Sequence, residues 1–195
     1  MRLAQPTDKH KVVDIIVTTF SQNPGVNWLL KKQGDHTKKL KRLAEFVFIK
    51  ALKREGVFLS SNEKGVAICY QFNKMSFSLS EIYHELRFVI NSVSLFRLHK
   101  VLKRESYRKK KRPGDGNYLY FWFLGVLDGG EKAVFELRDG IFKLAEKKGF
   151  PIYLETAVER NKVAYERYGF ETYHIWTDEK EDIKFWFMRW NPSSD

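Results

Sequence analysis

The residues with the most specific chemistry are Asn161 and Tyr165, in the segment "ERNKVAYERYGF" (159–170). In a helix, a spacing of four residues places both side chains on one face. Asn161 can then hydrogen-bond an amide of an extended ligand. Tyr165 can donate a proton to a leaving thiolate, because a phenol has a pKa of about 10 and a thiol one of about 8.5. Taken alone, each residue has a plainer explanation: a helix-start residue for Asn161, and core or interface packing for Tyr165.

A glycine turn is the second feature. In "LGVLDGGEKAVFELRDGI" (124–141), an apolar strand leads into Gly129 and Gly130 and then into a helical pattern. The first turn of a helix has unpaired backbone N–H groups and a positive dipole end, which favour phosphate oxygens. Glycine lets the backbone approach such a ligand because no Cβ stands in the way. The turn therefore predicts a site for an anionic ligand.

The surrounding patterns predict the elements that position these residues. Helical periodicity runs from Val12 to Phe20 and from Leu40 to Ala51, and residues 78–106 have a helical composition that fits one long helix or two. The same reasoning predicts the strands and the remaining helices. The strands are expected at 56–61, 65–72, 117–126, 152–156, 171–177 and 183–190, and the further helices at 134–145 and 159–168.

The order of these elements predicts the fold class. Helices, a hairpin and a further helical segment precede a strand–helix–strand–helix–strand–strand series, which is typical of an α/β or α+β protein with a mixed sheet. The strand at 117–126 is apolar almost throughout, so we expect it to be central and covered on both faces. The strand–helix–strand unit of 118–156 should form a right-handed parallel crossover.

This series of motifs resembles the GCN5-related N-acetyltransferase (GNAT) superfamily. The motifs that carry the resemblance are the apolar strand ending in "LGV", the turn and helix after it, "GFPIYLET" (149–156), and "ERNKVAYERYGF" with its closing Gly169–Phe170. They cover about residues 118–191. The resemblance implies an α/β (α+β) fold with a mixed, mostly antiparallel sheet of about six to seven strands flanked by helices. It also implies that residues 1–195 form a single acyl-coenzyme A N-acyltransferase-like domain.

The function that the resemblance implies is an N-acetyltransferase that transfers acetyl from acetyl-coenzyme A, its cosubstrate, to a primary amine by direct attack. Tyr165 would act as the acid. Glu155, at the end of "IYLET", is the first carboxylate to test as the base, and its alternative role is an ion pair with a lysine or arginine. A backbone N–H of the central strand near Val126 would polarise the thioester carbonyl.

The acceptor is expected to be a small-molecule or peptide amine. The resemblance implies a groove between the first two helices, and the residues expected to line it are Phe20, Asn23 and Trp28. Trp28 could equally pack the two helices together. No membrane partner is expected, and a homodimer is left open.

The cosubstrate is expected to contact ten residues: Leu124, Gly125, Val126, Gly129, Gly130, Glu131, Lys132, Ala133, Val134 and Asn161. The family's phosphate loop reads Gln/Arg-x-x-Gly-x-Gly/Ala, whereas the matching window here is "GGEKAV" (129–134). Val134 adds bulk and Glu131 adds an anion, while Lys132 offers a cation to phosphate. Three outcomes stay open: an active enzyme with a variant loop, a retained fold that binds coenzyme A weakly or not at all, and a glycine pair that acts one or two residues away.

The bulk composition indicates a folded chain. Its 195 residues are 43% hydrophobic and 15% aromatic, which excludes a disordered protein. The single cysteine, Cys69, excludes a disulfide framework and a thiolate metal site, and the five histidines show no metal-ligand spacing. The polar start "MRLAQPTDKHK" and the lack of a long apolar run predict a soluble protein in the cytoplasm, without a metal.

A basic run raises an alternative function. Lys100–Arg112 contains eight cationic residues and one glutamate, within a chain of net charge +11. Such a run is typical of a solvated helix end or loop, but a catalytically inactive GNAT-fold module could use it to bind nucleic acid or another polyanion. Only Tyr107 interrupts it as an aromatic residue, which argues against single-stranded nucleic acid as a partner.

Overall fold

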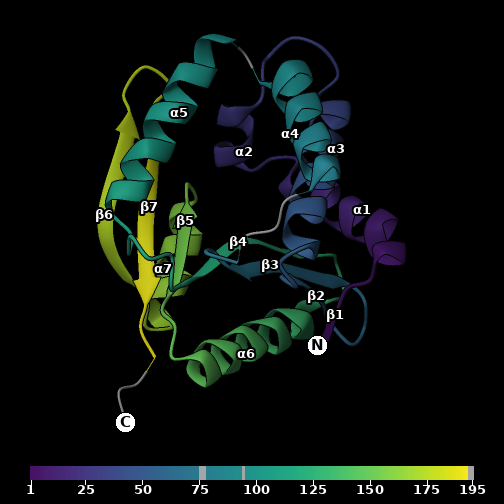
Figure 1. The fold of residues 1–195 in the computed structure, drawn as a ribbon, viewed down its shortest axis with the longest axis vertical. Helices are drawn as coiled ribbons and strands as arrows, with labels where there is room; N and C mark the ends of the chain where they lie inside the picture. Colours follow the sequence, from purple (N-terminus) through teal and green to yellow (C-terminus); the bar gives the residue numbers. More distant parts are fainter. Residues whose placement is uncertain (75–77, 94, 193–195) are drawn as a thin grey trace.

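One sheet organises the chain, in the strand order β1-β2-β3-β4-β5-β7-β6 (Figure 1). The computed structural model describes residues 1–74, 78–93 and 95–192. All neighbouring strands are antiparallel except β4 and β5, which are parallel. This confirms the mixed, mostly antiparallel sheet and the predicted hairpin, which β2 and β3 form. The strands are β1 (Arg2–Leu3), β2 (Val57–Leu59), β3 (Gly65–Gln71), β4 (Leu119–Val126), β5 (Ile152–Thr156), β6 (Glu171–Asp178) and β7 (Ile183–Trp190).

Helices cover both faces of the sheet. Helix α6 lies on one face, and α1, α3 and α4 lie on the other (Figure 1). The segment expected as one helix or two forms two, α4 and α5, and Val93 at the end of α4 has an extended backbone. The helices are η1 (Pro6–Asp8), α1 (Lys9–Phe20), α2 (Pro24–Leu29), α3 (His36–Leu52), α4 (Leu79–Ser92), α5 (Leu95–Lys110), α6 (Glu131–Lys148) and α7 (Glu159–Arg167).

Strand β4 is the centre of the core, as its apolar sequence predicts. Successive side chains of a strand point to opposite faces. Leu119 and Phe121 pack in the cluster that contains α6, whereas Tyr118, Tyr120 and Phe123 pack in the cluster that contains α1 and α3. All five side chains are buried, so the two layers of helices are held by the same strand.

Gly125 lets α1 approach β4 closely. A Cβ at this position would lie 2.4 Å from Oγ1 of Thr19 and 3.4 Å from a methyl carbon of Ile15. Thr19 and Ile15 both belong to α1, and the hydroxyl of Thr19 also donates a hydrogen bond to the carbonyl of Ile15. The space left by the missing Cβ of Gly125 is therefore filled by α1, which packs against β4 there.

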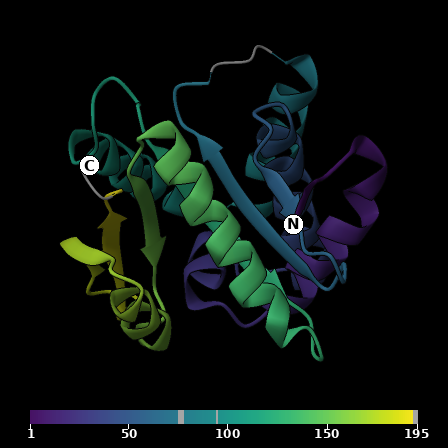
Figure 2. The ribbon, with the colours of Figure 1, turned by 90° about the horizontal axis from the view of Figure 1, so that it is seen from below.

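Strands β4 and β5 separate at their carboxyl ends. They pair only from Leu119↔Ile152 to Phe121↔Leu154, although both strands continue beyond this point. The register between β3 and β4 also shifts there: Cys69 lies opposite Phe121 and Ile68 opposite Phe123, which leaves Trp122 as an extra residue. An extra residue of this kind bends a strand and increases its twist. Figure 2 shows the two halves of the sheet running apart behind α6.

Candidate active site

A cavity of about 670 Å³ opens where β4 and β5 separate. Residues from both strands, from α7 and from the helices of the α1 face line it. Seven residues that the sequence singled out are among them: Phe20, Asn23, Trp28, Leu124, Glu155, Asn161 and Tyr165. The structure thus brings together the residues expected to act on the acceptor and those expected to act on the leaving group.

Tyr165 and Asn161 reach the cavity from α7, which begins directly after β5. The Tyr165 ring packs against Phe170, with ring centroids 5.5 Å apart. Burial raises the pKa of Tyr165 to about 12, and the neighbouring Tyr168 adds to this. Tyr165 is therefore a neutral phenol at physiological pH, and it can donate a hydrogen bond or a proton.

Glu155 lies on β5 among three arginines. Its carboxylate accepts hydrogen bonds from Arg104 (3.0 Å), Arg108 (3.4 Å) and Arg112 (2.6 Å). Burial raises the pKa of Glu155, but the attraction of the three guanidinium groups outweighs it and holds that pKa below its ordinary value. A carboxylate with a low pKa and occupied oxygens is a poor proton acceptor. Glu155 therefore does not fit the predicted role of general base, and it has the alternative role of an ion-paired carboxylate.

Aromatic side chains form a large part of the cavity wall. Trp28 packs edge-on against Phe185, with ring centroids 5.5 Å apart, and Phe20 packs against Phe123 at 4.7 Å. Asn23 has a structural contact as well, since its side-chain oxygen accepts from the N–H of Val26 (3.1 Å) and caps α2. Further aromatic residues of the wall are Phe46, Tyr70, Phe72, Phe88, Tyr120 and Trp122.

The glycine turn lies outside the residues that line this cavity. Gly129 has a φ of 71°, a conformation that glycine adopts without strain. Its N–H donates to the carboxylate of Glu131 (3.1 Å), and the N–H of Gly130 donates to the carbonyl of Leu127 (3.0 Å). The carboxylate of Glu131 thus accepts from one of the N–H groups expected to bind phosphate, so this anion competes with a phosphate for that group.

The other residues of the predicted cosubstrate site are divided between the core and the surface. Ala133 is buried beneath β3, where a Cβ on Gly65 would lie 2.8 Å from its methyl group. Val126 pairs with Gly65, five residues beyond the last β4–β5 pair, so the strand opening lies nearer Trp122 than Val126. Lys132 is exposed and Val134 half-buried at the start of α6.

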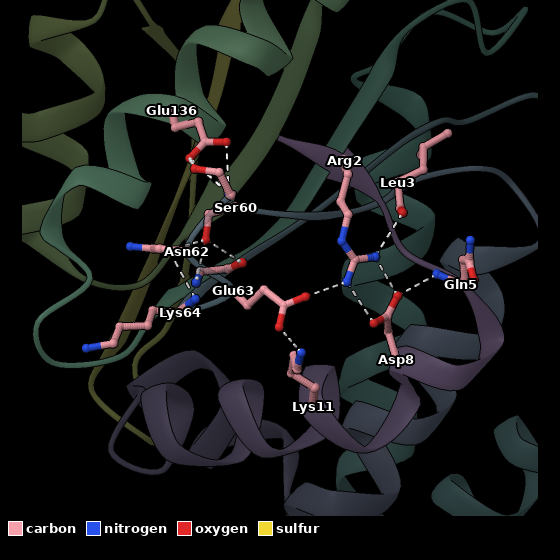
Figure 3. A network of polar contacts seen from close by, with 12 residues as sticks. Arg2, Leu3, Gln5, Asp8, Lys11, Ser60, Asn62, Glu63, Lys64 and Glu136 are labelled. Atoms are coloured by element: carbon pink, nitrogen blue, oxygen red, sulfur yellow. Dashed lines mark hydrogen bonds and ion pairs between the residues drawn. The ribbon is translucent and has the colours of Figure 1, made fainter.

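Lys64 is a cation at this turn that the sequence analysis did not identify. Its ammonium lies 3.5 Å from the carbonyl of Asp128 and 3.4 Å from that of Gly129. Close by, Arg2 forms ion pairs with Asp8 and Glu63, and Lys11 forms another with Glu63. The side chain of Lys64 points away from these two acidic residues (Figure 3).

The arginine cluster was also missed as part of the site. The basic run predicts a solvated surface or a polyanion partner, but Arg104, Arg108 and Arg112 point inward to Glu155. The signal is their spacing of four, which places Arg104 and Arg108 on one face of α5, and Arg112 follows two residues after the helix ends. Arg108 also donates to the hydroxyl of Tyr120 (2.8 Å).

Two other features bear on the type of site. Among the described residues, there is no group of three or more histidine, cysteine, aspartate or glutamate side chains placed to hold a metal ion. Cys69 is buried, and burial raises the pKa of its thiol. In the part of the chain that the structure describes, no helix is both long and apolar enough to cross a membrane.

Comparison with solved structures finds the same fold over almost the whole chain. The C-terminal condensation domain of Ebony, solved in complex with beta-alanyl-dopamine, has a TM-score of 0.69 at 14% identity, over 98% of this chain and 96% of that domain. A histone acetyltransferase HPA2 and related acetyltransferase from Corynebacterium glutamicum has a TM-score of 0.65 at 20% identity, over 100% and 96% of the two chains. Arylalkylamine N-acetyltransferase 2 from Aedes aegypti has 0.64 at 16% identity, over 98% of each chain. No protein-family model and no curated protein matches the sequence.

These likenesses identify the fold. The chain has the fold of these acetyltransferases, which confirms the fold that the resemblance of residues 118–191 implied. At identities of 20% or less, the comparison concerns the fold and leaves the reaction to be argued from the cavity.

Proposed function

We propose that the protein is an N-acetyltransferase that transfers an acetyl group from acetyl-coenzyme A to the primary amine of a small molecule. The observation that carries this proposal is the joint lining of one cavity by Asn161 and Tyr165 of α7 and by the open ends of β4 and β5. A donor on α7 thereby shares a cavity with the segments of β4 and β5 that no longer pair with each other. Acetyl-coenzyme A supplies the acyl group as an activated thioester.

The chain's own groups can perform three tasks in this reaction. Asn161 offers its side-chain amide to the extended arm of the cosubstrate. Backbone N–H groups of β4 near the extra residue Trp122 stabilise negative charge on the carbonyl oxygen. Tyr165 donates a hydrogen bond to the departing sulfur, and burial, which raises its pKa to about 12, keeps the phenol protonated for this role.

The arginine cluster helps the amine to become a nucleophile. Three guanidinium groups face two carboxylates, Glu155 and Glu105, so this wall carries one excess positive charge. Nearby positive charge lowers the pKa of an amine because it disfavours the ammonium form. The cavity therefore favours the neutral amine that direct attack requires, and this role does not need Glu155 as a base.

The start of α6 fits the phosphates of the cosubstrate in part. Its first amides and the left-handed Gly129 give the backbone of an anion site, and Lys64 and Lys132 add two cations. Glu131 opposes binding, since its carboxylate holds the Gly129 N–H. The side chain of Glu131 is exposed, so it can leave this amide without disturbing the core.

The aromatic walls favour an acceptor with an apolar or aromatic body. Phe20, Trp28, Trp122 and Phe185 are among the residues that line the cavity, and Trp28 and Phe185 contact Arg104, the partner of Glu155. Two of the similar structures are described as arylalkylamine N-acetyltransferases, and the Ebony domain was solved with beta-alanyl-dopamine. Those names support a small amine with an aromatic ring as the class of acceptor.

Binding of acetyl-coenzyme A is the first test. The melting temperature should rise with cosubstrate concentration, because a ligand at about 100 times its Kd stabilises the folded state by about 2.7 kcal/mol. Titration calorimetry should give one site per chain. Desulfo-coenzyme A, which lacks the sulfur, and inorganic pyrophosphate are the controls for binding without the thioester and for binding through phosphates alone. No heat and no shift at millimolar acetyl-coenzyme A would remove the proposal.

Replacing Glu131 with glutamine should tighten coenzyme A binding. The change removes a negative charge beside the phosphates and releases the Gly129 N–H, so we expect Kd to fall by about three- to tenfold, the effect of one charge-assisted contact near the surface. Asp128→Asn is the matched control, since it removes an exposed charge from the same turn without releasing that amide. Equal effects of the two variants in titration calorimetry would show that charge alone, and not the amide, controls affinity.

A further inference from the structure

Helix α5 separates its cations between two faces. Arg104 and Arg108 face the sheet, where they and Arg112, two residues beyond the helix end, meet Glu155, and Lys100 also faces the sheet and pairs with Asp178, whereas Lys103 is exposed. The arginines that meet Glu155 and the exposed Lys103 have different properties. The guanidinium group is planar and offers several donors in a fixed fork that matches a carboxylate, while the ammonium group is a strongly hydrated point charge.

The three arginines differ in how many of their donors are used and in whether a ligand in the cavity can reach them. Arg112 donates to Glu155 through Nη2, and its Nε and Nη1 have no hydrogen-bond partner among the described residues, but it is buried and is not among the residues that line the cavity. Arg108 is engaged by Glu155, by Glu105 and by the hydroxyl of Tyr120. Arg104 donates to Glu155 through Nη2 alone among the contacts of the described side chains, although a guanidinium has five N–H groups. Its side chain is 20% exposed and lines the cavity.

The guanidinium group of Arg104 is held between aromatic rings. It lies 4.1 Å from the ring centre of Phe185 and 5.4 Å from that of Trp28. The indole of Trp28 is itself fixed, because its Nε1 donates to Asp178 (3.2 Å), which also accepts from Lys100 (2.6 Å). A group held in this way loses little entropy when it binds a ligand, so its remaining donors are prepared for one.

Charge completes the argument. The cluster of Arg104, Arg108, Arg112, Glu155 and Glu105 carries one more positive than negative charge, beside a cavity whose wall is partly aromatic. An amine that enters as a cation is repelled by this excess. An amine that carries its own carboxylate neutralises the excess charge and satisfies free guanidinium donors of Arg104.

We infer that Arg104 is a specificity-determining residue that binds a carboxylate on the acceptor, so that the acceptor is an aromatic or apolar amino acid rather than a simple arylalkylamine. This inference rests on the proposed function for the reaction itself. The free N–H groups along the Nη1–Nη2 edge of the Arg104 guanidinium bind the carboxylate, and Trp28 and Phe185 hold the guanidinium in place. The side chain of the amino acid lies against the aromatic wall.

Matched acceptors test this inference. L-phenylalanine and 2-phenylethylamine differ only in the carboxylate, as do L-tyrosine and tyramine. With acetyl-coenzyme A, kcat/KM for the amino acid should exceed that for its decarboxylated partner by about tenfold or more, and Arg104→Gln should abolish this ratio mainly through KM. Lys103→Gln, which removes the neighbouring exposed cation, should leave the ratio unchanged. A wild-type preference for 2-phenylethylamine, or an unchanged ratio in Arg104→Gln, would overturn the inference.

A binding measurement separates this inference from the proposed reaction. Thermal shift or titration calorimetry with L-phenylalanine alone should detect binding to the wild type and to Lys103→Gln, and at least tenfold weaker binding to Arg104→Gln. Binding of the amino acid without any acetyl transfer would refute the proposed function and support the carboxylate site. Acetyl transfer to 2-phenylethylamine without binding of L-phenylalanine would refute the carboxylate site and support the proposed function.

Discussion

Replacing Tyr165 with phenylalanine is expected to lower kcat by about 10²- to 10⁴-fold, the usual contribution of a positioned proton donor. The change removes one oxygen atom and leaves the packing of the ring against Phe170 in place. Because the phenol acts on the leaving sulfur and not on the bound ground state, the Kd of acetyl-coenzyme A should remain within about twofold. Steady-state kinetics and titration calorimetry on the same preparations measure the two quantities.

Tyr168 provides the matched control for this experiment. It lies three residues further along, at the end of α7, and its ring contacts Arg138 of α6. Tyr168→Phe removes the same oxygen from a neighbouring tyrosine and should leave kcat within about twofold, which is normal for a substitution that touches no reacting atom. A Tyr165→Phe enzyme with wild-type kcat would refute the acid role, and an equal loss in both variants would point to a shared structural effect.

Residues close in the sequence allowed the best predictions. Asn161 and Tyr165 belong to one short helix that follows β5, so a spacing rule was sufficient to place them on one face and beside the end of a strand. The apolar run of β4 likewise identified the central strand, because burial on both faces requires it. In each case the deciding interaction lies within one element or between consecutive elements.

The arginine cluster depends on contacts between distant parts of the chain. Arg104 and Arg112 reach Glu155 across 51 and 43 residues, between α5 and β5. The sequence showed that Glu155 could pair with one of 35 lysines and arginines, but only the packing of α5 over β5, β6 and β7 selects three of them. Periodicity within α5 gave the spacing of the arginines, while the identity of their partner required the tertiary fold.

The glycine turn shows a different limit. Its shape and length were predicted from the glycine pair, and Gly129 has the expected left-handed conformation. Lys64 was missed because the β2–β3 hairpin brings it to the turn from about 65 residues earlier in the chain. The register Gly65↔Val126 sets this proximity, and pairing registers between non-adjacent segments are not encoded in either segment alone.

Glu155→Gln should destabilise the fold by about 3 to 5 kcal/mol, the usual effect of removing one partner from a buried ion pair. The carboxylate is 5% exposed, and its loss leaves Arg104, Arg108 and Arg112 facing one another without their shared anion. Urea unfolding measures the change. Glu105→Gln is the control, because Glu105 is 35% exposed and pairs with Arg108 alone, so its loss should cost less than about 1 kcal/mol.

The pH dependence of the Glu155 effect has a definite sign. The pKa of Glu155 is lower in the folded state than in the unfolded chain, so its contribution is complete above the unfolded pKa of about 4.3 and is lost as the pH falls through the folded pKa. The stability difference between wild type and Glu155→Gln should therefore be constant from neutral pH down to about pH 5 and shrink below it. A base role predicts the opposite pattern: Glu155→Gln would unfold like the wild type, and its rate would lose the acidic limb of the pH profile. The two roles therefore predict different results for the same variant. Measuring both the stability and the activity of Glu155→Gln decides between an ion-paired carboxylate and a general base.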